Sequence, residues 1–103
     1  MASSREYVGF ILDVCSGLSA RAMMGEYVLY YGGKVVGGVY DNRLLVKTTP
    51  SAEKLLPDAP RELPYEGAKE MLLIEDVEDG KFLEELLDAM VGELPEPKKK
   101  HKS

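Results

Sequence analysis

The chain has 103 residues, 45% of them hydrophobic, with one cysteine and no tryptophan. This length is enough for one domain with a single core and excludes two independent domains. No apolar run is long enough to cross a membrane, the first residues lack a signal-peptide pattern, and Cys15 alone excludes an intrachain disulfide. We therefore expect a cytoplasmic protein with no membrane partner.

Charge is unevenly distributed along the chain, whose formal net charge is −5. Lys98, Lys99, Lys100 and Lys102 are four of its 13 basic residues. Residues 1–97 therefore hold nine basic and 18 acidic groups, a net charge of −9. An acidic body repels nucleic-acid phosphates, so we expect direct DNA binding only weakly, through these lysines. The basic tail, residues 96–103, is predicted to be disordered, and its alternative interpretation is a solvated segment with no specific role.

The first predicted element is an amphipathic helix over residues 3–18. Its apolar side chains recur at helical spacing, and Ser3 with Glu6 forms a capping-box pattern. Cys15 lies at the margin of the apolar stripe. A catalytic thiolate would need a nearby base, but the only histidine is His101 in the tail. We therefore interpret Cys15 as a packing residue.

A four-strand antiparallel meander is predicted next, over residues 21–48. Aromatic and β-branched residues dominate it, and turns are expected at residues 25–26, 32–33 and 41–43. Glycine reaches positive φ without steric cost, so Gly32 and Gly33 favour a tight primed turn. Gly37 and Gly38 would weaken the third strand unless a bulge or a close neighbour needs the space.

The remaining elements follow from proline, cap and periodicity signals. Thr49 and Pro50 predict the start of a short helix, which Pro57 ends, and an extended connector follows to residue 65. The strand predicted at residues 71–77 is apolar on both faces, which suits an interior strand or a subunit interface. Met71 and Leu73 are its candidate interface residues. Asp79 caps a final amphipathic helix that ends near Gly92.

The sequence contains no pattern typical of catalysis or metal binding. One cysteine and one histidine, far apart, cannot supply a metal-ligand cluster. The acidic run at residues 75–80 lacks an oxygen ligand at the third EF-hand position, and the glycine-rich run at residues 32–38 precedes a strand instead of a helix. We therefore expect no enzyme activity, no cofactor and no metal.

Several residues resemble the signature of the TfoX N-terminal domain family: Arg21, Met23, Gly25, Tyr27 and Tyr30. The strand at residues 44–47, the proline-aromatic pair at 64–65 and the late strand at 71–77 extend the resemblance. It implies a two-layer α+β fold in which the N-terminal and C-terminal helices pack on one antiparallel sheet, similar to secretion-chaperone-like folds. The expected organisation is a single domain at residues 1–95, without the family's helical C-terminal domain.

The resemblance also implies a function. It indicates a non-catalytic protein-interaction or regulatory domain linked to transcription and competence, with a transcription-machinery protein and a second copy as candidate partners. The candidate binding residues are Arg21, Met24, Gly25, Tyr27 and Tyr30. Their alternative interpretation is a glycine turn with packed neighbours.

The meander tyrosines at positions 27, 30, 31 and 40 leave a second hypothesis open. They either pack in the core and at its rim or form a binding surface. A small-ligand-binding or catalytic domain would use Tyr27 and Tyr30 together with an acidic group such as Glu26.

Overall fold

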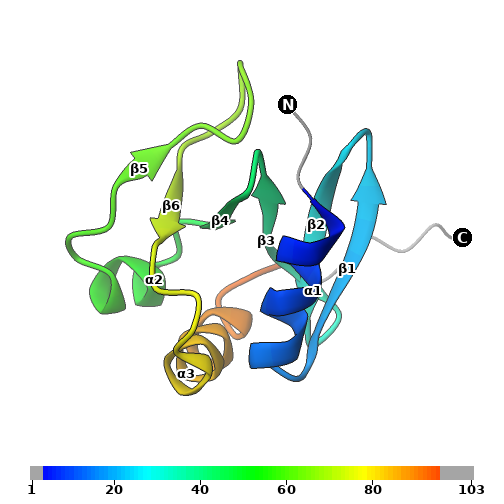
Figure 1. The fold of residues 1–103 in the computed structure, drawn as a ribbon. Helices are drawn as coiled ribbons and strands as arrows, with labels where there is room; N and C mark the ends of the chain where they lie inside the picture. The colour runs from blue at the N-terminus through cyan, green and yellow to red at the C-terminus, as the bar shows by residue number, and fades with distance from the viewer. Residues whose placement is uncertain (1–3, 96–103) are drawn as a thin grey trace, which may run out of the picture.

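A computed structural model describes residues 4–95 of the chain (Figure 1). In chain order the elements are α1 (Arg5–Val14), β1 (Leu18–Met23), β2 (Glu26–Tyr31), β3 (Lys34–Tyr40), β4 (Arg43–Val46), α2 (Pro50–Leu55), β5 (Arg61–Glu62), β6 (Met71–Ile74) and α3 (Gly80–Val91). The predicted α+β class, with one antiparallel sheet and terminal helices, is confirmed. Within residues 4–95, no helix has the length and apolar character needed to span a bilayer.

The six strands form one antiparallel sheet in the order β1-β2-β3-β4-β6-β5. Its three meander hairpins close through two-residue turns with positive φ at both positions. These turns are Met24-Gly25 (53° and 87°), Gly32-Gly33 (60° and 82°) and Asp41-Asn42 (55° and 57°). Positive φ at both central residues is the primed geometry that matches strand twist. The expected turn at Gly32-Gly33 is confirmed, whereas the first turn lies one residue earlier than predicted.

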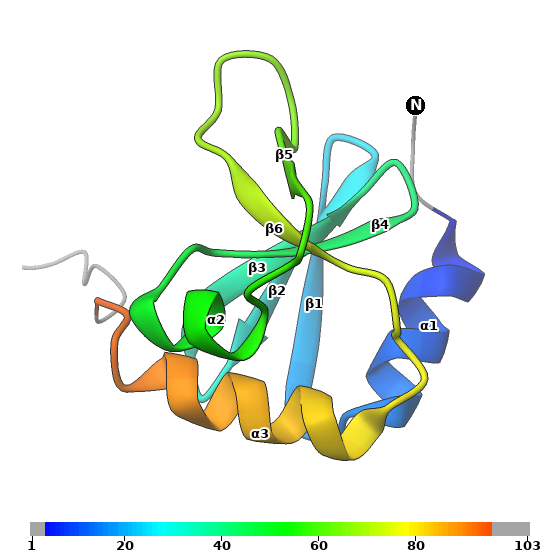
Figure 2. The same ribbon diagram turned by 90° about the vertical axis from the view of Figure 1, so that its left-hand side faces the viewer.

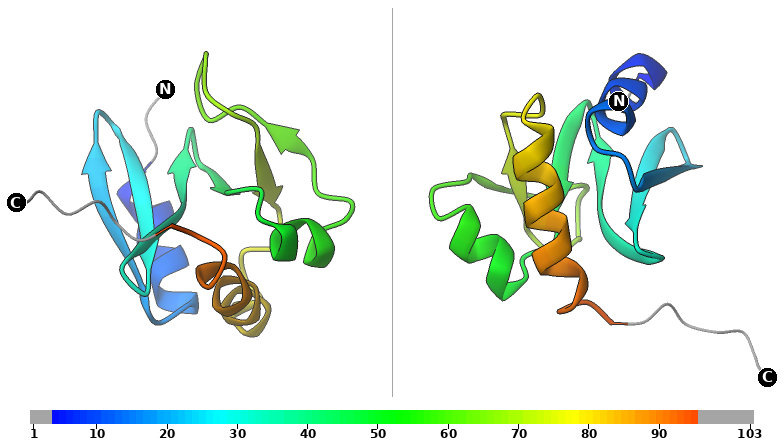
Figure 3. Two further views of the ribbon diagram at one scale, coloured as in Figure 1. Left: turned by 180° about the vertical axis from the view of Figure 1, so that it is seen from behind. Right: turned by 90° about the horizontal axis from the view of Figure 1, so that it is seen from below.

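Helices α1 and α3 cover one face of the sheet, and α2 lies beside α3 (Figures 2 and 3). Their inward side chains join those of the strands in one core. It includes Val8, Ile11, Leu29, Val39, Leu44, Val46, Leu72, Leu83, Leu86 and Met90. Cys15 is fully buried in this core, so its predicted packing role is confirmed. Burial raises the pKa of the Cys15 thiol, and the negative charges of Glu84 and Asp88 add to the effect.

The helix ends follow from side-chain caps. Ser4 caps α1, because its Oγ accepts a 3.1 Å hydrogen bond from the Tyr7 N–H. The sequence had favoured Ser3, which lies outside the described residues, and the helix ends at Val14, well before the predicted residue 18. Thr49 caps α2 and Asp79 caps α3, as predicted. At the far end of α3, the Lys34 ammonium donates to the carbonyls of Val91 and Leu94 at 2.9 and 3.0 Å.

Glycines 37 and 38 lie where β3 meets close neighbours. The pairing register of β2 with β3 shifts between Leu29 and Tyr30, which places a bulge beside the two glycines. A Cβ at Gly37 would come within 2.1 Å of the Leu45 carbonyl oxygen, and one at Gly38 within 2.5 Å of the Tyr40 ring. The predicted need for space at this pair is therefore confirmed.

Several strand predictions needed correction. The fourth strand ends at Val46 instead of residue 48, and β6 ends at Ile74 instead of residue 77. The proline-bounded connector contains β5, a two-residue edge strand that pairs with β6. Because β6 lies between β4 and β5, the prediction of an interior strand is confirmed. The predicted basic tail lies outside the described residues.

Candidate functional site

The second face of the sheet, which we call the open face, lies opposite α1 and α3. It carries Val28, Val35, Tyr40 and Leu45, because strand side chains alternate between faces and Leu44 and Val46 point into the core. Leu45 is fully buried yet lies outside the helix-side core cluster. The open face is therefore partly apolar and partly covered, although no long helix of residues 4–95 packs on it.

An apolar hollow of about 520 Å³ opens on this face, and we call it the open-face groove. It is lined by Met23, Met24, Glu26, Tyr27, Val28, Val35, Tyr40, Pro64 and Tyr65. These residues come from the β1–β2 hairpin, from β3 and from the loop between β5 and β6. The β1–β2 and β3–β4 turns and the β5–β6 loop lie toward the same end of the sheet (Figure 1). A second hollow of about 490 Å³ shares Val35, Tyr40, Pro64 and Tyr65 and extends the groove toward Met71.

Exposed apolar side chains gather at this groove. Among residues 4–95, five large apolar side chains are exposed: Phe10, Met23, Met24, Leu63 and Tyr65. Three of the five line the open-face groove, namely Met24 at 97% exposure, Tyr65 at 63% and Met23 at 50%. Apolar side chains concentrated at one hollow are typical of a surface that binds another molecule.

Met24 is almost fully exposed and has an unfavourable backbone conformation. Its φ of 53° lies in the left-handed region, which costs a residue with a Cβ roughly 1–2 kcal/mol. Asp41 and Asn42 also have positive φ, but Asn and Asp tolerate that region better than Met does. Because the Met24 side chain is 97% exposed, burial within the domain does not offset this cost. Local strain of this kind tends to occur at functional sites.

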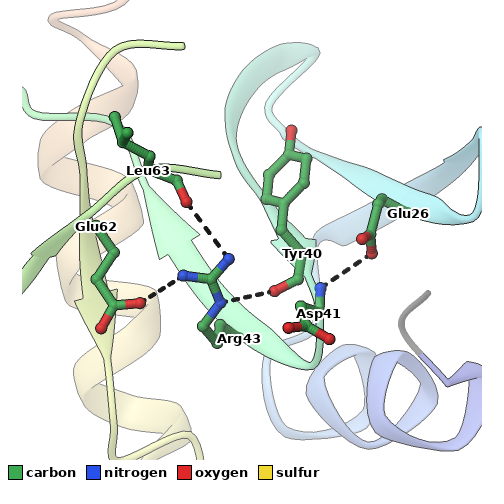
Figure 4. A network of polar contacts seen from close by, with 6 residues as sticks. All are labelled: Glu26, Tyr40, Asp41, Arg43, Glu62 and Leu63. Atoms are coloured by element: carbon green, nitrogen blue, oxygen red, sulfur yellow. Dashed lines mark hydrogen bonds and ion pairs between the residues drawn. The ribbon is translucent and has the colours of Figure 1, made fainter. Parts of the chain in front are cut away.

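Arg43 holds the wall of the groove in place (Figure 4). Its guanidinium donates to the Tyr40 carbonyl at 3.1 Å and to the Leu63 carbonyl at 3.4 Å, and it forms an ion pair with Glu62. One side chain thus connects the end of β3 to the segment that leads into Pro64 and Tyr65. At the turn between β3 and β4, the Asp41 N–H donates a 3.1 Å hydrogen bond to the Glu26 carboxylate.

Tyr40 and Tyr65 meet across the groove. Their ring centroids are 6.1 Å apart and the ring planes are inclined by 59°, a tilted aromatic contact. Burial raises the pKa of the Tyr40 hydroxyl, and Tyr65 and Glu26 raise it further. Tyr40 therefore stays protonated at neutral pH and can donate a hydrogen bond to a ligand without acting as a base. Within residues 4–95 no group of three or more His, Cys, Asp or Glu side chains could hold a metal ion.

The candidate binding residues predicted from the sequence do not all line one hollow. Met24 lines the open-face groove, and Gly25 forms the adjacent turn with φ 87°. Tyr27 also borders the groove, but it is paired with Val39 and its side chain packs against the helix-side core. Arg21 and Tyr30 instead line another hollow, of about 320 Å³, which we call the edge hollow. The two tyrosines of the ligand-binding hypothesis therefore do not share a pocket.

The candidate interface residues of β6 are also separated. Met71 lines the hollow that extends the groove, whereas Leu73 lines a different hollow beside α2 and is paired with Leu45. Both side chains are half-buried in an interior strand.

Arg43 and Tyr65 were not predicted as site residues, whereas Tyr40 was one of the meander tyrosines of the binding-surface hypothesis. Tyr65 had a signal, the proline-aromatic pair at 64–65, but that pair does not indicate which part of the sheet it faces. Arg43 had none, because its partners lie in a connector whose path depends on the pairing of β5.

Comparison with known proteins places the chain in a family. The model of the TfoX N-terminal domain matches residues 11–84. The chain is 36% identical over 102 residues to an uncharacterized 12.7 kDa protein in the trpE 5′ region of Spirochaeta aurantia, an alignment that covers 95% of this chain and 89% of that protein. No solved structure matches the chain. The matched region includes β1 to β6, hence both the sheet and the groove, and the chain belongs to the TfoX N-terminal domain family.

Proposed function

We propose that this domain is a non-catalytic protein-interaction domain with a regulatory role, and that it binds an apolar segment of a partner protein in the open-face groove. The observation that carries the proposal is the clustering of Met23, Met24 and Tyr65, which exposes apolar surface at one hollow. Interaction sites on otherwise polar surfaces show this combination of an apolar centre and a polar rim.

The charge of the body favours a protein partner over a nucleic acid. Residues 1–97 carry a net charge of −9, and the charged residue that lines the open-face groove, Glu26, is acidic. Phosphate backbones are repelled by such a surface. We propose a cytoplasmic partner from the transcription machinery, because transcription and competence are the roles of the TfoX-type regulators whose N-terminal domain this chain resembles.

The first experiment identifies the partner. The tagged chain is used to capture proteins from a nuclease-treated lysate of its own host, and the retained proteins are identified by mass spectrometry. A retained protein is then purified, and its affinity for the domain is measured by titration calorimetry. A regulator or polymerase subunit that binds the purified domain directly supports the proposal.

Variants of the groove test whether that binding uses the proposed surface. Met24→Gly removes an exposed side chain while relieving backbone strain, and Tyr65→Ser removes an exposed ring. Each should weaken binding about tenfold or more, as expected for an interface anchor. Phe10→Ser is the matched control, because Phe10 is exposed but is not part of the groove. Unchanged affinity in both groove variants, or equal loss in the control, would contradict the proposal.

A further inference from the structure

The two edge strands of the sheet differ in length and in protection against further pairing. One edge strand is β5, which has two residues and lies between Pro60 and Pro64. The other edge strand is β1, whose six residues include no proline or lysine. Among residues 4–95, β1 pairs with β2 alone. Exposed edge strands are normally protected by proline, lysine, a bulge or a covering segment. The outer side of β1 is therefore able to accept another strand.

Alternate residues of β1 direct their backbone groups away from β2. Met23 and Glu26 flank a two-residue turn, and the pair that flanks such a turn is hydrogen-bonded. Because hydrogen-bonded and non-hydrogen-bonded pairs alternate, the N–H and C=O groups of Leu18, Ala20 and Ala22 point outward. The Leu18 N–H donates a hydrogen bond to the Cys15 carbonyl, with 3.4 Å between nitrogen and oxygen. Ala20 and Ala22 have small side chains, so a second strand can approach them closely.

We propose that two copies of this chain pair antiparallel along β1, centred on Ala20, so that their sheets join into one. In a two-fold arrangement that keeps the helices of both copies on the same side, opposing residues must belong to the same face. Two such registers have their two-fold axis at the middle of β1. One pairs Ala20 with Ala20 of the second copy, and the other pairs Arg21 with Arg21 of the second copy. The Arg21-centred register would set two guanidinium groups directly opposite each other, which is unfavourable. The Ala20-centred register sets Arg21 opposite Ser19 of the second copy.

The edge hollow can receive that arginine. It is lined by Gly17, Ser19, Ala20, Tyr30, Gly32 and Gly33 together with the domain's own Arg21, and it opens beside β1. Ser19 is paired with Tyr30 across β1 and β2, so an arginine opposite Ser19 lies in one row with Ser19 and Tyr30. The small Ser19 side chain allows the guanidinium to extend over it toward the Tyr30 ring. A cation above an aromatic face is attracted by the ring.

Charge makes β1 the suitable edge for contact between two copies. Strand β1 contains Arg21 and no acidic residue, although the body of the chain carries a net charge of −9. Pairing along β1 therefore brings together a part of each copy that lacks negative charge. The contact uses the edge hollow and not the open-face groove, so it is independent of the function proposed above.

Sedimentation equilibrium of the full chain tests the assembly. We expect a particle of twice the 11.4 kDa chain mass at concentrations of roughly 100 µM, typical of a small-interface dimer. Arg21→Glu should raise the dimer dissociation constant about tenfold or more, because it replaces the cation at Tyr30 by an anion. Lys81→Glu is the matched control, since it makes the same charge change on exposed α3 and should leave the constant within about twofold. A monomeric wild-type chain, or equal effects of both variants, would overturn the proposal.

Oxidative cross-linking tests the register. Ser19→Cys protein is mixed with Arg21→Cys protein, and the disulfide-linked products are separated by mass. The Ala20-centred register predicts mixed dimers, because directly opposed residues lie within disulfide range. Cross-linking of Arg21→Cys with itself would instead show the Arg21-centred register and reject the one proposed. If neither product exceeds the background of the wild-type chain, whose Cys15 is buried, then β1 is not the contact.

Discussion

The Tyr31 hydroxyl donates a 2.6 Å hydrogen bond to Asp88 Oδ1, which joins β2 to α3 across 57 positions of the chain. This bond favours the protonated phenol and raises the pKa of Tyr31 to about 12, and burial and the negative charge of Asp88 add to the effect. The last helix and the centre of the meander are thus coupled by a group that titrates in alkaline solution.

Stability should therefore fall in alkaline solution. The pKa of Tyr31 in the folded chain is about 12, above the ordinary value of 10.0, so the folded state holds this proton more tightly than the unfolded state. The contribution of Tyr31 is fully present below pH 10 and is lost as the pH rises toward 12. Urea unfolding of the wild-type chain and of Tyr31→Phe, measured across this range, should show a steeper decline for the wild type. Parallel declines would show that Asp88 does not hold the Tyr31 proton.

Replacing Gly38 by alanine should destabilise the sheet. The added Cβ would lie 2.5 Å from the Tyr40 ring and 2.6 Å from the Tyr27 carbonyl oxygen, and the backbone oxygen cannot move aside easily. We expect Gly38→Ala to lower the free energy of unfolding by about 1–3 kcal/mol in urea titrations. Gly9→Ala is the control, because a Cβ added at Gly9 would have no neighbouring atom within 4 Å and alanine favours a helix. If both variants lost the same stability, steric crowding at Gly38 would not be the cause.

At the first turn, removing a side chain should stabilise the domain. Met24→Gly relieves a left-handed backbone at a 97% exposed position, so the free energy of unfolding should rise by roughly 0.5–1 kcal/mol. The neighbouring change Met23→Gly should have the opposite sign, since Met23 lies in β1 and glycine weakens strands. Thermal and urea unfolding of the two variants measure this contrast. A stability loss at Met24 would indicate that its side chain supports the fold.

The Arg43 contacts should control the order of the loop between β5 and β6. Arg43→Met removes the bonds to Tyr40, Glu62 and Leu63, so amide hydrogen exchange in residues 63–70 should accelerate. The stability cost should be about 1 kcal/mol, because the ion pair is partly buried. Arg61→Met breaks a more exposed pair with Glu53 and should cost less than about 0.5 kcal/mol. Slow exchange in the loop of the Arg43 variant would mean that other contacts hold Tyr65.

The sequence was sufficient to predict turns, helix caps and helices whose conformation depends on one short segment. Gly32-Gly33 forms a primed turn, Thr49 and Asp79 cap helices, and α3 follows its apolar spacing, all as predicted. Strand β1 begins three residues earlier than expected, since Leu18-Ser19-Ala20 has weak strand preference and is extended by pairing with Tyr31, Tyr30 and Leu29.

The candidate site was harder to predict, because its parts come from distant segments. Met24 and Tyr27 were candidate binding residues from the family resemblance, but Tyr40 and Tyr65 meet only after β4, β5 and β6 have paired. Met24 also adopts a backbone conformation that its residue type disfavours, so no propensity rule anticipates that turn. Sequence indicated part of the lining, and tertiary pairing determined which residues share a cavity.

The contact between Gly80 and Val14 has a consequence for synthesis on the ribosome. A Cβ at Gly80 would lie 2.1 Å from the Val14 carbonyl oxygen, so the start of α3 fits directly against the end of α1. Leu83, Leu86, Leu87 and Met90 of α3 complete the core, yet they are translated after every strand. The nascent sheet therefore exposes its apolar face until α3 has emerged from the exit tunnel. Until α3 docks, that face is open to aggregation or to a chaperone.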